Sequence, residues 1–490
     1  MTDALHQRTR GPALFVSALI LSGCAAVGPN YQPPVVAVDA AFVNTGQPAA
    51  VSQATSADIA TFWRGFDDPA LTELVERALA ANHDVRLASE RLQESRANLL
   101  GAEAELLPNI GLSGGVNRSR APEYTVPGTT AGQRTATVYD AGFTASWELD
   151  FFGRNRRASE SAAAQVDVSA AGIQAAHTAV SAETARNYLE LRGLQQRYEV
   201  AQESLKNQRD ALRITSARVD LGRGTRLDVV RAQSLVDSTE ATLPALQAAI
   251  DRTSYRLATL TAQPLRDLAG RLATPRPLPA LPATDLGLLP LGTPEQLLRR
   301  RADLRQAERQ LASATAEIGV ATADLFPRVS LSGLLGLATT RFDSLGDSGS
   351  RQYAFGAAIS WPLLDFGRVR SRISASESRA RQALTSYEQT IAIALEETEG
   401  ALSLFTRSAQ QSERLASAAR NAQEATRLAR ARFDAGVVDF LIVLDAERET
   451  LAARDALVQS QVSQATSLVG IYRALGGGWS PTDTAGQAAR

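Results

Sequence analysis

The sequence has very little of the side-chain chemistry on which disulfides, metal centres and most enzyme sites depend. Its 490 residues include one Cys, one Met and three scattered His. A single thiol cannot form a disulfide within the chain, and zinc sites need several Cys or His at close spacing. The sequence also contains no nucleophile–base pair and no phosphate-binding loop. We therefore expect neither an enzyme nor a protein that holds a metal or another cofactor.

An excess of charge of either sign is also lacking. Lys and Arg number 51 against 52 Asp and Glu, which gives a formal net charge of −1. Proteins that attract polyanions through their overall field carry a clear basic excess. The balanced charge therefore gives no reason to expect nucleic acid as a partner.

The N-terminus carries a targeting pattern. Arg8 and Arg10 precede an apolar stretch at 12–21 that is too short to span a bilayer. It ends in Leu21-Ser-Gly-Cys24, which resembles a bacterial lipobox. The alternative is an ordinary signal peptide with a chance Cys, but the single Cys of the chain stands where lipidation needs it. We predict a lipoprotein signal peptide at 1–23 and an acyl anchor on Cys24, which holds a protein to lipid by about 0.8 kcal/mol per buried methylene.

The chain contains one long unit twice. Trp147-Glu-Leu-Asp-Phe-Phe-Gly-Arg154 returns as Trp361-Pro-Leu-Leu-Asp-Phe-Gly-Arg368 at an offset of 214, and Arg-x-Asp-x-Gly222 returns as Arg-x-Asp-x-Gly436 at the same offset. Upstream, a Pro-x-x-x-Leu-Ser-Gly motif recurs at an offset of 219, from Pro108 to Pro327. A period of this length indicates duplicated halves rather than a short solenoid repeat.

Hydrophobic periodicity gives each half the same order of elements: a helix, a β-hairpin, a very long helix, a Gly turn and a return helix. The expected bounds in the first half, 69–263, are helices at about 70–105, 154–221 and 225–262 and a hairpin at about 108–150. In the second half, 295–475, they are helices at about 295–325, 368–435 and 439–474 and a hairpin at about 327–364. The remaining parts are a lipidated extended segment at 24–68, a crossover at 264–294 whose seven prolines predict a non-helical path, and a C-terminal tail at 476–490.

Each predicted strand has about ten residues, with one apolar face and one small or polar face, which is the weak signature of a transmembrane β-strand. Tyr139, Trp147, Tyr353 and Trp361 lie near strand ends, where membrane-interface aromatics occur. The alternative is that these are soluble hairpins that pack their apolar face on a core. A lipid-facing sheet is favoured because the flanking helices are expected to pair with each other. Four strands cannot close a barrel, so other copies must supply the rest. Two copies would give eight strands and three would give twelve.

The predicted long helices are too charged for lipid and, at 1.5 Å per residue, could each span roughly 100 Å. They must therefore project into an aqueous space. Each ends at a glycine in C-cap position, Gly222 or Gly436. Thr225 and Asp228 then have the spacing of a capping box, and Asp439 can cap the second return helix.

Taken in order, these motifs resemble the outer-membrane factors, the TolC-like tunnel proteins of tripartite export pumps, in their OprM/NodT-type lipoprotein subgroup. The resemblance covers essentially the whole mature chain. It rests on Cys24 with Val27-Gly-Pro-Asn-Tyr-Gln-Pro-Pro34, Trp63 with Phe66-Asp-Asp-Pro69, both duplicated motifs and Leu475-Gly-Gly-Gly-Trp479. It implies a mostly α fold with a transmembrane β-barrel part: a homotrimer with a 12-stranded β-barrel in the outer membrane and a periplasmic α-helical barrel. It also implies a periplasmic adaptor (membrane fusion) protein and an inner-membrane RND-type pump as partners.

The resemblance further implies a periplasmic gate made by residues just after the helical turns. The matching positions are Leu441, Asp445, Arg448 and, in the first half, Asp228. A position that is acidic in some relatives is Ile442 in this chain, and one that is basic is Val438. Two acidic rings are therefore not expected, and a hydrophobic ring over one acidic ring fits better. Three Asp around an axis repel one another and can hold a cation. The alternative is an exposed Asp445–Arg448 pair across one helical turn.

The expected function is an outer-membrane exit duct of a tripartite efflux pump, which passively conducts drugs or other small molecules and is docked by the adaptor at the Gly222 and Gly436 turns. Two alternatives stay open at this point. One is the exit duct of a type I protein-secretion system. The other is a periplasmic coiled-coil lipoprotein scaffold without a pore. The expected location is the bacterial cell outer membrane, with a lipid anchor and a periplasmic helical domain.

Overall fold

The computed structural model describes residues 26–45, 59–282, 286, 289 and 291–478. Cys24, the predicted signal peptide at 1–23 and the tail from 479 lie outside these residues. The described chain divides into two compact units. The first comprises Met1–Pro34, Arg91–Ser169 and Gln306–Tyr387, and the second comprises Val35–Glu90, Ala170–Arg305 and Glu388–Arg490. Both halves of the duplication therefore contribute to each unit.

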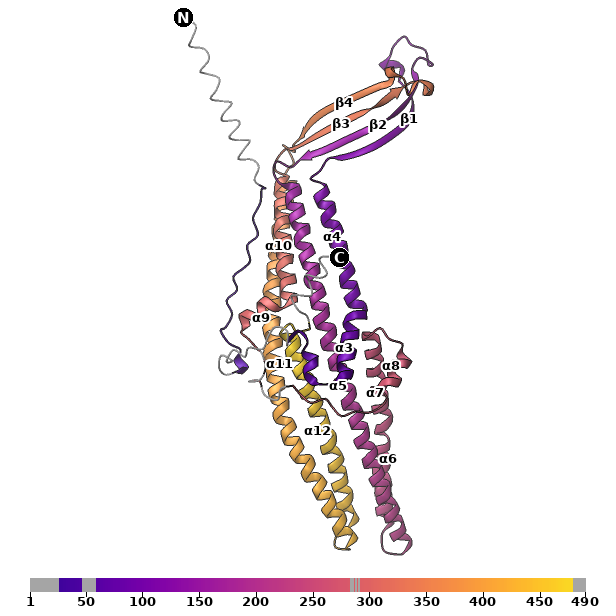
Figure 1. Ribbon diagram of the computed structural model, residues 1–490, viewed down its shortest axis with the longest axis vertical. Helices are drawn as coiled ribbons and strands as arrows, with labels where there is room; N and C mark the ends of the chain where they lie inside the picture. Colours follow the sequence, from indigo (N-terminus) through magenta and orange to yellow (C-terminus); the bar gives the residue numbers. More distant parts are fainter. Residues whose placement is uncertain (1–25, 46–58, 283–285, 287–288, 290, 479–490) are drawn as a thin grey trace. The chain divides into compact units, whose positions relative to one another are not determined.

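The first unit contains one antiparallel sheet of four strands in the order β1-β2-β3-β4 (Figure 1). The strands are β1 (Asn109–Arg120), β2 (Thr135–Leu149), β3 (Arg328–Thr339) and β4 (Arg351–Ser360). β2 pairs with β3, so the two hairpins join into one sheet whose edge strands are β1 and β4.

The two hairpins match each other in register and in hydrogen bonding. Asn109 lies opposite Ser146 in the first, and Arg328 lies opposite Ser360 in the second, which are the same positions of the repeat. The indole Nε1 of Trp147 donates to the Leu106 carbonyl oxygen at 3.0 Å, and Nε1 of Trp361 donates to the Leu325 carbonyl oxygen at 3.0 Å. The duplication seen in the sequence thus extends to individual contacts.

Most of the described chain is helical, and the two longest helices, α5 (Arg154–Asp220) and α11 (Arg368–Asp434), have 67 residues each. The shorter helices are α3 (Pro69–Ala81), α4 (His83–Ala104), α6 (Arg226–Glu240), α7 (Thr242–Leu260), α8 (Leu265–Leu272), α9 (Pro294–Arg300), α10 (Ala302–Ala323) and α12 (Phe440–Ala474). None of the helices in the described ranges is both long enough and apolar enough to cross a membrane. The predicted fold class is confirmed: a mostly helical chain of two repeats, each with one hairpin.

Three of the helices expected as single pieces are interrupted. The first breaks at Asn82, whose buried side chain donates to the Leu260 carbonyl oxygen at 2.9 Å and accepts from the Asp84 amide at 2.8 Å. The break at Arg301 has a similar cause, because its guanidinium contacts Asp303 and Glu397. In both cases a buried polar side chain makes bonds that a continuous helix would not allow. The third break separates α6 from α7 at Ala241.

The predicted non-helical path of 264–294 is wrong at its start. Leu265–Leu272 form α8, which buries Leu268 and Leu272. Pro264 occupies the N-cap position, where the missing amide hydrogen costs the helix nothing, and the next proline is Pro275. Proline count alone therefore overstated the break in this segment.

The core of the second unit is built around an aromatic motif in the segment expected to be extended. Phe62–Phe66 form a 3-10 turn, and the Phe62 ring stacks on Tyr472 at 5.0 Å between centroids. Asp68 caps α3 and accepts a hydrogen bond of 2.6 Å from the Tyr188 hydroxyl. Burial, together with Asp68, raises the pKa of Tyr188 to about 12. The segment before α3 is thus part of the fold of the helical unit.

Candidate functional site: the helical turns, the sheet rim and the N-terminal strap

The α5–α6 and α11–α12 turns have the same backbone geometry. Gly222 and Gly436 adopt φ of 71° and 74°, in the left-handed region that favours glycine. The amide of Arg223 donates to the Arg218 carbonyl at 2.8 Å, and that of Val437 donates to the Arg432 carbonyl at 2.9 Å. This six-to-one bond is the Schellman motif, which ends a helix and reverses the chain.

A contact between α5 and α11 joins the two turns. The Arg218 guanidinium lies 4.0 Å over the Phe433 ring, and its Nη1 donates to the Phe433 carbonyl at 3.5 Å. Its Nη2 is 3.9 Å from the Asp434 carboxylate. A cation over an aromatic face is stabilising even where both are partly exposed. The sequence analysis assigned Arg218 to a repeated motif but did not predict this contact.

Beyond the second turn, α12 has a buried face and an exposed face. Phe440, Val443 and Leu444 pack in an apolar cluster with Ala232 of α6 and Ala429 of α11. The predicted gate residues lie on the exposed face, at intervals of four and three residues, and Leu441 has 41% of its surface exposed. Arg448 donates to Asp445 at 3.3 Å, and both side chains are more than half exposed. The structure therefore places Leu441, Asp445 and Arg448 along one stripe.

The caps of the two return helices differ. Asp228 completes a capping box: its Oδ2 accepts from the Thr225 amide at 3.1 Å and from the Thr225 hydroxyl at 2.7 Å. The carboxylate of Asp228 thus already has a structural partner in the first turn. Asp439 is at the N-cap position of α12, but its side chain accepts no capping bond, so the expected cap there is wrong. The Ile442 amide instead donates to the Asp439 backbone carbonyl at 3.2 Å.

A buried ion pair in the same hairpin escaped the sequence analysis. Glu447 is 5% exposed, and its Oε1 accepts from Arg430 at 2.6 Å (Nη2) and 3.0 Å (Nε). Within the described chain Oε2 has no hydrogen-bond partner. Burial raises the pKa of Glu447, although Arg430 acts in the opposite direction. The spacing from Val443 and Leu444 put Glu447 on the apolar stripe, which was the signal available in the sequence.

The sheet carries the four aromatic residues predicted to lie at a membrane interface. Trp147 and Trp361 are 37% and 51% exposed. Their indole nitrogens donate to the carbonyl oxygens of Leu106 and Leu325, respectively. Tyr353 is 77% exposed, and Tyr139 packs edge-on against Phe342 at 5.5 Å. The Trp pair is therefore at the end of the strands nearest the helices and the Tyr pair at the end nearest the connecting loops.

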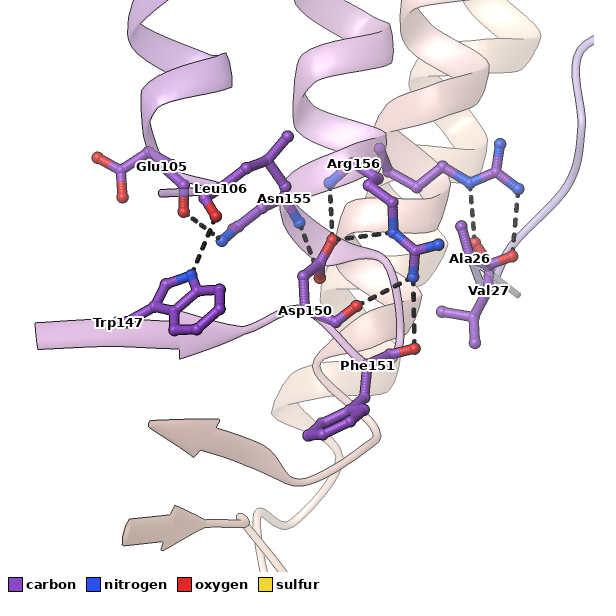
Figure 2. A network of polar contacts seen from close by, with 10 residues as sticks. Ala26, Val27, Glu105, Leu106, Trp147, Asp150, Phe151, Asn155 and Arg156 are labelled. Carbon is purple, nitrogen blue, oxygen red and sulfur yellow. Dashed lines mark hydrogen bonds and ion pairs between the residues drawn. The ribbon is translucent and has the colours of Figure 1, made fainter. Parts of the chain in front are cut away.

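An N-terminal strap, Ala26–Asn30, is fixed beside the start of α5 (Figure 2). Arg157, which is 4% exposed, donates from Nε to the Val27 carbonyl at 3.0 Å and from Nη2 to the Asn30 side chain at 2.7 Å and the Gly28 carbonyl at 3.3 Å. A Cβ on Gly319 would lie 2.7 Å from the Arg157 side chain and 2.9 Å from the Val27 carbonyl. Because Gly319 has no side chain, there is room for the strap beside it.

Comparison with known proteins places these features in a family. The family model described as "Outer membrane efflux protein" matches residues 74–263 and 293–477, well over half of the chain. The chain belongs to the outer membrane efflux protein family. The two matched stretches correspond to the two halves of the duplication, each from its first helix to its return helix.

Individual relatives match almost end to end. Nodulation protein T of Rhizobium leguminosarum bv. trifolii is 32% identical over 474 residues, which are 96% of this chain and 97% of that protein. The toluene efflux pump outer membrane protein TtgI of Pseudomonas putida is 32% identical over 467 residues, which are 94% and 97% of the two chains. The solved outer-membrane channel OprN is 39% identical, covers 93% of this chain and all of its own, and has a TM-score of 0.86.

Family membership decides three of the sequence-based predictions. The protein is an outer-membrane channel, the exit duct of an efflux system, and it is located in the outer membrane. It is not an enzyme, because the family consists of channels. The scaffold without a pore is thereby excluded.

We predict that Arg157→Ala releases the strap. The substitution removes charge-assisted bonds to the backbone of 27–28 and to Asn30, each of which contributes about 1.5–3 kcal/mol. The strap should then open at least about tenfold more often, measured as faster hydrogen exchange or proteolysis within 26–34. Arg156→Ala is the matched control, because Arg156 is the neighbouring arginine and binds Asp150 and the Phe151 carbonyl (Figure 2). Equal opening in both variants would contradict the role of Arg157.

We also predict a pH-dependent weakness in the second turn when Arg430 is removed. Arg430→Gln leaves the Glu447 carboxylate buried without its partner, which costs about 1–3 kcal/mol at neutral pH. The folded hairpin holds the Glu447 proton more tightly than the opened one, so the loss should shrink as pH falls through the raised pKa and be complete above it. Hydrogen-exchange protection of 440–448, corrected for intrinsic rates, measures the effect.

Arg448→Gln is the control for this experiment. It also removes one Arg from an acidic partner on α12, but Asp445 is exposed to water, so protection should change little at any pH. A loss in Arg448→Gln as large as that in Arg430→Gln, or a loss in Arg430→Gln that grows on acidification, would show that burial of Glu447 is not the cause.

Proposed function

We propose that this channel works as a homotrimer in a tripartite efflux pump, receiving small molecules from a periplasmic adaptor and an inner-membrane RND-type pump. The observation that carries the proposal is the sheet of four strands with two edges, β1 and β4. An open edge in lipid leaves unpaired backbone groups that cost several kcal/mol each, so the edges need neighbours from other copies.

The number of copies follows from the space inside the barrel. Two copies would supply eight strands, and an eight-stranded barrel encloses little more than its own inward side chains. Three copies supply twelve strands and leave an aqueous passage wide enough for solutes. Trp147, Trp361, Tyr139 and Tyr353 would then form the two aromatic girdles that border the lipid-facing band.

An acyl anchor on Cys24 fits the position of the strap. The strap begins at Ala26, two residues after Cys24, and is bonded beside the junction of β2 and α5, where the Val27 amide donates to the Phe152 carbonyl at 3.0 Å. Trp147 lies at the same end of β2. The acyl chains would therefore enter the bilayer at the level of the aromatic residues nearest the helices.

The gate is proposed at the exposed stripe of α12. In a trimer, three copies of Leu441 would form an apolar ring and three copies of Asp445 an acidic ring, next to each other along the passage. Like charges around one axis raise the cost of closing unless a cation or Arg448 compensates. Asp228 belongs to this region as the capping residue of α6.

The adaptor is proposed to engage the two turns. Leu221 and Val437, next to Gly222 and Gly436, are 74% and 61% exposed. Leu221 precedes its glycine and Val437 follows its own, so each turn exposes one apolar side chain beside the glycine, where a partner can dock. The small-molecule cargo is supported by a relative whose name describes toluene efflux, whereas no observation on the described residues favours a protein cargo.

The trimer and the function can be tested together on protein extracted in mild detergent. We expect a particle with the mass of three chains of about 52 kDa plus lipid and detergent, and mass spectrometry should find acyl groups on Cys24. In cells that lack their own outer-membrane efflux channels, the chain with its adaptor and pump should lower the accumulation of a small apolar dye. A monomer released without detergent, or accumulation that the chain leaves unchanged, would overturn the proposal.

We predict that Leu441→Ala combined with Asp445→Ala opens the resting channel. Removing the apolar ring and its neighbouring charge ring should raise the resting conductance of single channels in planar bilayers several-fold. Ile442→Ala is the matched control, because Ile442 is 50% exposed but lies about 100° around the helix from Leu441. Unchanged conductance in the double variant would contradict the assignment of Leu441 and Asp445 to the gate.

A further inference from the structure

The two faces of the four-stranded sheet differ in charge as well as in polarity. Residues opposite each other in neighbouring strands lie on the same face, so the register assigns each paired residue to one of the two. One face carries Asp140, Glu148 and Arg328 among small and polar side chains. The other carries the exposed apolar side chains Ile110, Leu112, Val116, Phe143, Leu335, Phe355 and Ile359. In a transmembrane barrel this apolar face is the one that contacts lipid.

Within the four strands, the apolar face has three charged residues, and all three are arginines. Arg118 and Arg120 occupy alternate positions of β1, and Arg351 is the first residue of β4. Each lies at the end of its strand that joins the connecting loops, 121–134 and 340–350 (Figure 1). The Cα atoms of Arg118 and Arg120 are roughly 7 Å apart at the rise of a β-strand. The apolar face therefore ends, on the loop side, in positive charge alone.

The guanidinium groups of these three arginines are exposed, and none has an ion pair or side-chain hydrogen bond among the residues that the structure describes. The arginines of the neighbouring loops differ in this respect. Arg134 donates to Glu123 at 3.2 Å, and Arg341 donates to Asp343 at 2.6 Å. The loops thus pair their own arginines, whereas those of the apolar face keep their donors for a partner outside the chain.

An anion at the surface of the membrane fits this position. A charged side chain on the lipid face costs much free energy at the bilayer centre and little near the interface, so the three arginines mark where hydrocarbon gives way to head groups. The loop end of the sheet is the end away from the periplasmic helices and therefore faces the outer leaflet. The main lipid of that leaflet in bacterial outer membranes is lipopolysaccharide, a phosphorylated glycolipid. A guanidinium group presents a planar fork of donors that matches phosphate oxygens.

We propose that Arg118 and Arg120, with Arg351 on the same face, bind the phosphate groups of lipopolysaccharide on the outside of the barrel. The acyl chains of this lipid then lie along the apolar face below, over Val116 and Tyr353, which are 67% and 77% exposed. At the helix end the same face has no charged residue in any of the four strands, so the site belongs to the outer leaflet alone. The inference rests on the proposed placement of the sheet in the membrane and adds which lipid the channel binds and where.

Lipid binding to the purified oligomer tests the site. The probe is diphosphoryl lipid A, the phosphorylated anchor of lipopolysaccharide, and bound lipid is counted by native mass spectrometry in mild detergent. The test variant combines Arg118→Gln with Arg120→Gln. We expect its apparent Kd for lipid A to rise at least about tenfold, because charge-assisted hydrogen bonds to phosphate are lost. Arg351→Gln should weaken binding further when it is added to this pair.

The matched control combines Arg134→Gln with Arg341→Gln. It removes the same charge from the same end of the sheet, but these two arginines already have acidic partners in the loops, so the Kd should stay within about threefold of the unaltered chain. Unchanged lipid A binding in the test variant, or an equal loss in the control, would overturn the site. The same spectra give the mass of the oligomer, and a monomer there would overturn the proposed assembly whatever the lipid result.

Two further measurements separate charge from fold and one lipid from another. Arg118→Lys with Arg120→Lys keeps both charges and should bind lipid A within about threefold of the unaltered chain, also where the Gln pair assembles poorly. A loss in the Lys pair as large as in the Gln pair would overturn a site based on charge. Phosphatidylglycerol, which has one phosphate, should bind at least about fivefold more weakly than diphosphoryl lipid A. Equal affinity for both lipids would overturn the assignment to lipopolysaccharide.

Discussion

The hydrogen-bonding requirement of the backbone in lipid is the constraint on which the rest of this structure depends. A strand in a bilayer must have both sides paired, because lipid offers no donors or acceptors. This chain supplies four strands in one sheet, β1 to β4, and closes only the inner three seams itself. In the proposed trimer, strands of other copies pair with the two outer edges, β1 and β4. The duplication means that both hairpins of the chain share one register.

The junction between each hairpin and its long helix shows how the two repeats meet one requirement in different ways. The first amides of α5 need acceptors, and Asp150 accepts from the amides of Asn155 and Arg156 at 3.2 and 2.9 Å (Figure 2). In the second repeat Asp365 accepts from Gly367 and Val369 at 3.0 and 2.7 Å, and these amides lower its pKa. The acceptor of the second repeat, Asp365, is one residue later than the position that corresponds to Asp150. The next residue, Phe366, has a left-handed backbone.

Much of this arrangement could be predicted from the sequence because it depends on local rules. Period-2 and period-3.6 patterns identify the strands and helices, and Gly222 and Gly436 mark turns that only a left-handed residue makes easily. The breaks at Asn82 and Arg301 could not be predicted, because they depend on partners far along the chain, such as Leu260 and Glu397. Helix α8 was missed because a count of prolines ignores where they stand.

The region of the proposed gate shows the same division between local and distant causes. A resemblance can point to Asp445, but the nearby burial of Glu447 depends on how α6, α11 and α12 pack together. The two carboxylates are two residues apart on α12, and each is bonded to an Arg, yet their surroundings differ in a way that matters for opening. The Glu447–Arg430 pair links α12 to α11, so breaking it leaves a buried carboxylate without its partner, which costs free energy. The Asp445–Arg448 pair is in water and can be exchanged at little cost. A gate built on the exposed stripe can therefore rearrange its charges while the α11–α12 hairpin keeps its own fold, which favours opening by movement of whole hairpins over local unfolding of the turn.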